Sequence, residues 1–172
     1  MAQGPLYEQD AVQPMRDELI AVGISELLTP EAVDEVMAKP GTAMVLVNSV
    51  CGCAAGNARP GAMLALQNKV IPDSITTVFA GQEREAVERA RHHMTGIMPS
   101  SPCIALFKDG KPVAVLERHH IEERNAMQVA EALVGAFNEF CTKAGPSIPE
   151  AELLKIPVFH GCGSEIPKVG PQ

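Results

Sequence analysis

A buried strand that leads directly into a pair of cysteines is the feature that most constrains the fold of this chain. Residues 42–47 form a continuous, valine-rich apolar run after the turn signal Pro40-Gly41, which predicts a buried β-strand. Residues 54–69 favour a helix, although glycine and proline near the start of this segment predict a kinked or delayed first turn. The chain therefore places Cys51-Gly52-Cys53 at a strand-to-helix junction.

The rest of the pattern predicts an α/β fold built around a mixed sheet. A second strand and a surface helix follow the cysteines, and Asp109-Gly110 between two apolar runs predicts an antiparallel hairpin. Two parallel strands joined by a crossover helix, followed by this hairpin, give a central mixed four-stranded sheet with helices on both faces. The expected helices span residues 15–22, 30–39, 54–69, 82–94 and 122–140, and the expected strands span residues 42–47, 74–80, 103–107 and 113–116.

The length and composition predict one compact domain with terminal extensions. The chain has 172 residues, of which 46% are hydrophobic and only 3% aromatic, so the core is expected to be aliphatic. We expect an N-terminal helical extension over residues 1–29, the main domain over 30–142, and a C-terminal tail over 143–172. The tail is treated as an appendage, because proline and glycine become frequent there and no long periodic segment remains.

The charge and cysteine content exclude several classes of partner and compartment. A net charge of -7 argues against nucleic-acid binding, which depends on clustered lysine and arginine. No apolar run is long enough to span a membrane, and no secretory signal is visible. An odd count of five cysteines without such a signal predicts reduced thiols in the cytoplasm rather than a disulfide framework. The oligomeric state is left open.

The cysteine pair indicates thiol–disulfide exchange. The thiolate is the attacking species in this chemistry, and the free N–H groups and dipole of a helix start would stabilise it at Cys51. We expect Cys53 to lie deeper in the first turn, so that Cys51 attacks a partner's disulfide and Cys53 resolves the intermediate. Gly52 fits a tight ring whose backbone angles a side chain would oppose. This ring is expected to be strained and fairly oxidising.

Several neighbouring residues are candidates to support the pair. Asn48 and Ser49 could donate hydrogen bonds to the thiolate, or they could make only local turn contacts. Arg59 could lower the pKa of Cys51 or bind a carboxylate of a small thiol, with an ordinary solvated arginine as the alternative. Pro102 is expected to be cis and to provide a backbone docking site for substrate beside Cys51; the alternative is a trans proline that opens a strand.

The other cysteines and histidines are assigned lesser roles. Cys103 and Cys141 are expected to be buried bystanders. Cys162 lies between two glycines in the tail, so it is either a third thiol that swings to Cys51 or an incidental cysteine. Two pairs of soft ligands could together bind zinc, but the spacing within each pair is shorter than in usual zinc sites and no metal is expected. These ligands would be Cys51, Cys53, His160 and Cys162, and the other histidines are given no role.

Three stretches of the sequence resemble known families. Ser101-Pro102, followed by residues 103–110, is similar to the thioredoxin segment in which a cis proline precedes a hairpin and faces the active cysteines. Residues 47–60 (VNSVCGCAAGNARP) and 78–82 (VFAGQ) resemble the bacilliredoxin family, over roughly residues 14–141. This resemblance implies a thioredoxin-like fold and a bacterial protein that removes bacillithiol from mixed disulfides. It also implies Cys51 as nucleophile and Cys53 as resolving thiol, with weak disulfide isomerase activity as an alternative.

The resemblance implies no tightly bound cofactor, and the partners would be protein mixed disulfides and a low-molecular-weight thiol. The chain departs from the related patterns in two places. Val45 stands where thioredoxin has a buried acid, and the tail is longer than the family pattern. A functional hypothesis of another class remains open for the same fold, namely a non-catalytic binding module that senses redox state or holds zinc.

Overall fold

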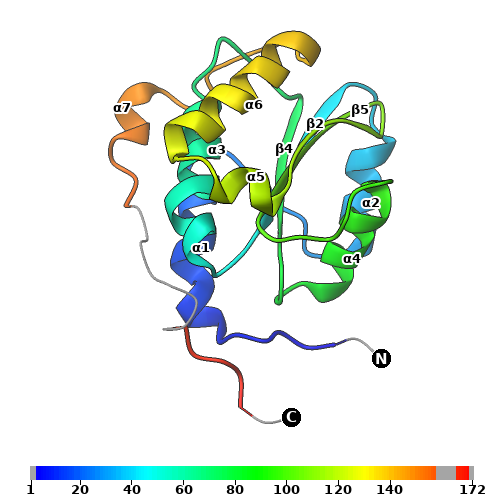
Figure 1. Ribbon diagram of the computed structural model, residues 1–172, viewed down its shortest axis with the longest axis vertical. Coiled ribbons are helices and arrows are strands. Elements are labelled where there is room, and N and C mark those ends of the chain that lie inside the picture. Colours follow the sequence, from blue (N-terminus) through cyan, green and yellow to red (C-terminus); the bar gives the residue numbers. More distant parts are fainter. Residues whose placement is uncertain (1–2, 158–165, 171–172) are drawn as a thin grey trace.

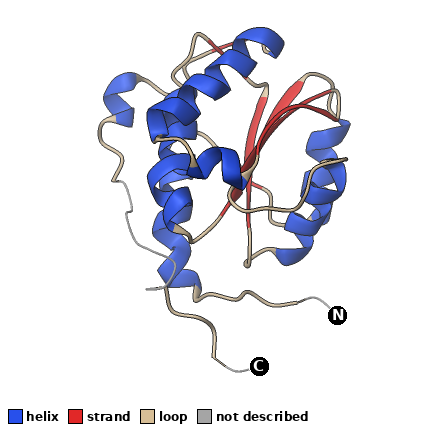
Figure 2. Cartoon of the chain, viewed as in Figure 1, coloured by secondary structure: helices blue, strands red, loops and turns tan. Residues whose placement is uncertain are grey.

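A mixed sheet lies between two layers of helices in the computed structural model, which describes residues 3–157 and 166–170 (Figures 1 and 2). The sheet has five strands in the order β1-β4-β2-β5-β6. The parallel part contains β1 (Ser25–Glu26), β4 (Ser74–Phe79) and β2 (Thr42–Asn48). The hairpin of β5 (Cys103–Lys108) and β6 (Lys111–Leu116) adds the antiparallel part. The α/β class and the mixed sheet are confirmed.

The sheet has one strand more than the four predicted. The additional strand, β1, is only two residues long and pairs Ser25 with Thr76 of β4. So short a segment carries no alternating pattern in the sequence, and only its position beside β4 makes it a strand. The other predicted strands are found within a few residues of their expected bounds.

Helices cover both faces of the sheet, as expected (Figure 1). One layer contains α1 (Gln9–Ala21), α3 (Arg59–Ala65) and α6 (Ala126–Phe140), and the other contains α2 (Pro30–Ala38) and α4 (Arg84–His93). Strand β2 is buried along its whole length. Its alternate side chains enter opposite cores: Met44 and Leu46 join the first layer, and Val45 joins the second. Each such side chain contributes about 1.5–3 kcal/mol by burial.

The predicted helix over residues 122–140 is two helices in the structure. A five-residue helix, α5 (Arg118–Glu122), ends before Asn125, which caps α6 by accepting a hydrogen bond from the Gln128 N–H at 2.9 Å. The buried residues of α6 are Val129, Ala130, Leu133 and Phe137. Met127, in the first turn of α6, lies off this stripe and is 58% exposed. No helix among the described residues combines the length and apolarity that a membrane crossing requires.

The described residues near both termini pack against the domain. In the tail, β7 (Lys143–Ala144) pairs with β3 (Val70–Ile71), and a short helix, α7 (Glu150–Leu153), follows. Ile166 is buried in one apolar cluster with Val12, Met15, Val50 and Phe79. The described residues of the tail are therefore packed against the domain. The boundaries at residues 30 and 142 stay predictions.

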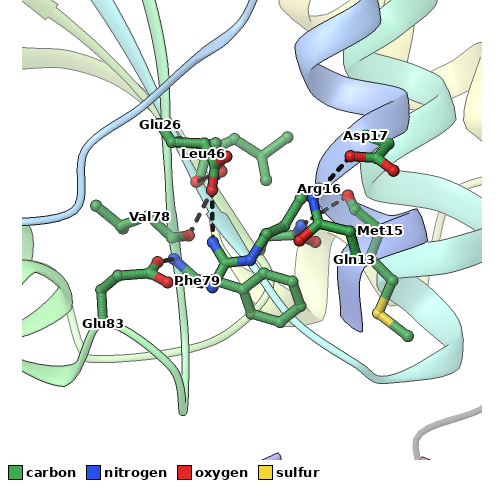
Figure 3. A network of polar contacts seen from close by, with 11 residues as sticks. Gln13, Met15, Arg16, Asp17, Glu26, Leu46, Val78, Phe79 and Glu83 are labelled. Atoms are coloured by element: carbon green, nitrogen blue, oxygen red, sulfur yellow. Dashed lines mark hydrogen bonds and ion pairs between the residues drawn. The ribbon is translucent and has the colours of Figure 1, made fainter. Parts of the chain in front are cut away.

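A buried arginine fastens the N-terminal helix to the sheet (Figure 3). Arg16 on α1 donates to Glu26 of β1 at 2.5 Å and pairs with Glu83, whose carboxylate also accepts the Phe79 N–H at 3.1 Å. The guanidinium lies 5.1 Å from the centroid of the Phe79 ring. Such a cation–π contact adds about 1 kcal/mol. Helix α1 is thus held in place at the end of β4, next to β2, the strand that leads to the cysteines.

Candidate active site

The cysteine pair lies at the end of the central strand, where the chain turns into a helix. The Cys51 carbonyl accepts hydrogen bonds from the backbone N–H groups of Ala54 and Ala55, at 3.1 and 3.2 Å. The predicted irregularity of the first turns is confirmed, because a π-helix, η1 (Ala54–Ala58), precedes α3. Single π-helical turns of this kind occur frequently at functional sites.

The two thiols are close together and both are partly exposed. Cys51 Sγ lies 2.8 Å from Cys53 Sγ, and both residues are free cysteines. The expectation that Cys53 is the more deeply buried is not met, because the two side chains fall in the same intermediate range of exposure. Gly52 does not have a left-handed backbone, and a Cβ built there meets nothing within 4 Å. The dithiol form therefore gives no reason for a glycine at this position.

The surroundings favour the thiolate at Cys51 and the thiol at Cys53. Burial raises the pKa of Cys51, but hydrogen bonds from Cys53, Ser49 and the Ala54 N–H, together with the charge of Arg118, outweigh it and lower the pKa. The pKa of Cys53 is raised to about 11, first by burial and then by its hydrogen bond to Cys51 and the negative charge there. Cys51 therefore ionises first, and Cys53 keeps its proton and donates it.

Ser49 contacts Cys51 directly, whereas Asn48 contacts Ser49 and not the thiol. The Cys51 N–H donates to Ser49 Oγ at 3.3 Å, and the Ser49 N–H donates to Asn48 Oδ1 at 2.9 Å. The Asn48 amide group donates to the Met15 carbonyl on α1 at 3.3 Å. Asn48 thus links the loop that carries the thiols to the N-terminal helix and does not donate to the thiolate.

Arg59 is inside the protein, so the carboxylate-binding role and the solvated alternative are both wrong, and an effect on the pKa of Cys51 stays a prediction. Its side chain is 0% exposed, so it is neither a solvated arginine nor able to bind a small thiol in solution. It pairs with Glu18 of α1 and donates to Asn48 Oδ1 at 3.0 Å and to the Ser49 carbonyl at 2.9 Å. The ordering of the thiol loop therefore depends on a buried ion pair that the sequence does not reveal.

The Ser101–Pro102 peptide bond is cis, as predicted. Strand β5 begins at Cys103, which pairs with Val47 near the end of β2. Ser101 and Pro102 therefore lie at the same end of the sheet as the cysteine pair. This position agrees with the expectation that they form part of the active site.

Arg118 is a site residue that the sequence analysis missed. Its guanidinium donates to the Ser101 carbonyl at 3.1 Å and to Glu122 at 2.6 Å, and its charge lowers the pKa of Cys51. The hairpin contains a signal that could have found it. Ile104 pairs with Leu116, so two further residues along each strand bring position 118 beside position 102.

The remaining cysteines are consistent with their predicted roles as far as the structure describes them. Cys103 is buried, and burial raises the pKa of its thiol to about 11. Cys141 is also buried, and burial raises its pKa. His160 and Cys162 lie outside the described residues, so the third-thiol and zinc hypotheses for them stay untested.

One other group of possible metal ligands lies near Arg118. The ligand atoms of Glu117, His119 and His120 are within 4.8 Å of one another. However, His120 Nδ1 accepts the Glu117 N–H at 3.0 Å, and the Glu117 side chain caps α5 in return. Two of the three residues, Glu117 and His120, are therefore already engaged in starting α5, and we assign no metal to the group.

Comparisons with known proteins show the family of this chain. A family model described as Disulphide isomerase matches residues 7–141. A bacilliredoxin from Cytophaga hutchinsonii is 50% identical over 134 residues, covering 78% of this chain and 99% of the relative. One from Salinibacter ruber is 47% identical over 164 residues, covering 94% and 95%. The chain belongs to the bacilliredoxin family. A bacilliredoxin from Staphylococcus aureus is 48% identical over 136 residues, covering 79% of this chain and 94% of the relative.

A solved structure described as having a thioredoxin fold matches this chain with a TM-score of 0.50. It is 22% identical and covers 63% of this chain and 92% of that one, so the likeness concerns the fold alone. Together with the thiol pair, membership of the bacilliredoxin family makes the protein a thiol–disulfide oxidoreductase or isomerase. Most of the tail also has a counterpart in a relative, since the Salinibacter ruber match covers 94% of the chain.

Proposed function

We propose that this protein removes bacillithiol from mixed disulfides on other proteins, with Cys51 as nucleophile and Cys53 as resolving thiol. The observation that carries the proposal is the unequal pair: a Cys51 with a lowered pKa lies 2.8 Å from a Cys53 that keeps its proton. The bacilliredoxin relatives support bacillithiol as the small thiol. No tightly bound cofactor is needed for this chemistry.

The exchange balances in two steps. The Cys51 thiolate attacks the sulfur of the small thiol, a new disulfide forms between them, and the client protein's cysteine leaves as a thiolate. In the dithiol route, Cys53 loses its proton and attacks Cys51 Sγ, so the small thiol leaves and the pair ends oxidised. In the monothiol route, a second molecule of the small thiol instead attacks the small-thiol sulfur of the intermediate, so that the two small thiols form a disulfide and Cys51 leaves as a thiolate. We place the protein in the cytoplasm, where free thiols are kept reduced.

The test uses a reporter protein that carries bacillithiol on a single cysteine, with release followed by mass spectrometry under excess substrate and a reductant for the pair. We expect repeated turnover for the wild type and none for Cys51→Ser. Cys103→Ser is the matched control, because that thiol is buried and has a raised pKa. Failure of the wild type to release bacillithiol, or activity that survives Cys51→Ser, would overturn the proposal.

The same site supports a second activity, disulfide isomerisation, which is favoured by the description of the matching family model. An isomerase needs one attacking thiolate, and the client's own thiol can then resolve the intermediate. Reactivation of a protein with scrambled disulfides should therefore survive Cys53→Ser. The dithiol removal of bacillithiol should not, unless free bacillithiol is added. Loss of both activities in Cys53→Ser would contradict the isomerase assignment.

A further inference from the structure

We propose that Arg118 binds a carboxylate on the small-thiol half of the mixed disulfide and so makes the enzyme selective for acidic low-molecular-weight thiols. The inference rests on the proposed function and adds a recognition residue to it. Arg118 would contact the substrate directly, whereas Arg59 is enclosed by the protein.

The guanidinium of Arg118 is held in place by two hydrogen bonds and keeps further N–H donors for a ligand. Its Nε donates to Glu122 at 2.6 Å and its NH1 group donates to the Ser101 carbonyl at 3.1 Å. Within the described part of the chain, the NH2 group has no hydrogen-bond partner, and the side chain is 47% exposed. A guanidinium has five N–H donors in a plane, a geometry that matches a carboxylate. Unused donors of a fixed group therefore face solvent beside the thiols.

The position of Arg118 suits a ligand that is attached to Cys51. Its backbone N–H donates to Ser100 Oγ at 3.2 Å, and its side chain contacts Ser101, so two bonds hold it against the segment that leads into Pro102. Its charge acts on both sulfurs, since it lowers the pKa of Cys51 and opposes the rise at Cys53. In a thiol such as glutathione the nearer carboxylate lies about six bonds from sulfur, so a ligand disulfide-bonded to Cys51 can extend it toward a cation whose charge acts on both sulfurs.

The charges around the site explain why an acidic ligand would need this residue. The protein has a net charge of -7, and Glu122 lies directly beside Arg118. Without the guanidinium, a carboxylate near Cys51 would meet only repulsion from this acid. The Arg118–Glu122 pair is an exposed i, i+4 pair, which is weak, so a ligand carboxylate can join or replace Glu122.

The experiment compares three mixed disulfides on the same cysteine of a reporter protein: glutathione as the anionic thiol, 2-mercaptoethanol as the neutral one and cysteamine as the cationic one. Each enzymatic rate is divided by the uncatalysed rate with dithiothreitol, which removes intrinsic reactivity. We expect the wild type to favour glutathione over 2-mercaptoethanol by about tenfold, as one charge-assisted contact in a partly exposed site would give. Arg118→Gln should abolish this preference, and Arg118→Lys should keep part of it.

Rates are measured at a pH where Cys51 is fully ionised in every variant, so that a change in its pKa cannot imitate recognition. Arg124→Gln is the matched control, because Arg124 also lies near α5, but among the described residues its side chain binds only the His120 carbonyl, at 2.8 Å. In the wild type, the preference for glutathione should also shrink as salt is added. This salt dependence tests the inference without relying on any variant.

The outcomes separate this inference from the proposed function. An equal fall of all three rates in Arg118→Gln, with the preference unchanged, would show that Arg118 acts only through the charge at Cys51. That result, or a wild type without any preference, would overturn the inference and leave the removal of bacillithiol standing. Absence of turnover on every disulfide, including the bacillithiol one, would overturn both.

Discussion

The hydrogen bond between the two thiols makes the most direct prediction about reactivity. Cys53 Sγ lies 2.8 Å from Cys51 Sγ and retains its proton, so it donates to the Cys51 thiolate. Cys53→Ala removes this donor, whereas Cys53→Ser keeps a hydroxyl donor in nearly the same place. Since Ser49, Ala54 and Arg118 are unchanged in both variants, the comparison isolates one hydrogen bond.

The expected magnitude follows from the strength of such a bond. A hydrogen bond to a charged group contributes about 1.5–3 kcal/mol when well shielded, and roughly half of that remains in a partly exposed pair. One pKa unit corresponds to about 1.4 kcal/mol. The pKa of Cys51 should therefore be about one unit higher in Cys53→Ala than in Cys53→Ser.

The assay is a pH titration of the ultraviolet absorbance of the thiolate, supported by the pH dependence of alkylation by iodoacetamide. Both variants carry Cys162→Ser, so that no tail thiol contributes, and a Cys51→Ser spectrum is subtracted as background. Equal pKa values in the two variants, or a lower value in Cys53→Ala, would refute the role of Cys53 as donor.

Three further predictions concern stability. A Cβ at Gly61 would lie 2.5 Å from Val129 Cγ1, so Gly61→Ala should lower the free energy of unfolding in urea by about 1–3 kcal/mol. Gly135 has open space for a Cβ, so Gly135→Ala should raise this free energy by about 0.5–1 kcal/mol. Equal effects of the two substitutions would contradict the packing around Gly61. Arg59→Met breaks a buried ion pair and should cost about 3–5 kcal/mol by the same assay, and a loss below about 1 kcal/mol would mean that the pair is dispensable. Burial raises the pKa of Cys103 from 9.0 to about 11, so the folded state is favoured by about 2–3 kcal/mol relative to a protein in which this thiol is ionised. This contribution is fully present below pH 9.0 and is lost as the pH rises toward 11. Thermal melts of Cys103→Ala should therefore show a smaller alkaline loss than those of the wild type, and an identical loss would argue against this burial effect.

The central part of the site could be predicted because its signals are local. The apolar run of β2 and the helix-forming residues after it place Cys51 and Cys53 at a junction, and Asp109-Gly110 determines the hairpin. The break between α5 and α6 also had a local signal that was missed. Asn125 and Gln128 have the spacing of a capping box, which predicts a helix start after residue 125.

The rest depends on contacts between residues far apart in the chain. Strand β1 exists only because Ser25 meets Thr76, and nothing in its two residues indicates a strand. Arg59 is a strongly polar residue whose burial is possible only because Glu18, on a helix 41 positions earlier, pairs with it. A sequence pattern reports periodicity within a segment, and it does not report which distant charge will neutralise which.

The apolar cluster of Val12, Met15, Val50, Phe79 and Ile166 has a consequence for the biosynthesis of the enzyme. Val50 directly precedes the nucleophile, yet its cluster includes a residue near the end of the chain. Before the ribosome adds Ile166, the strand and the cysteines have already been synthesised, but the Val50 side chain lacks part of its cover. The nascent chain therefore carries its thiols before the apolar cluster around Val50 is complete.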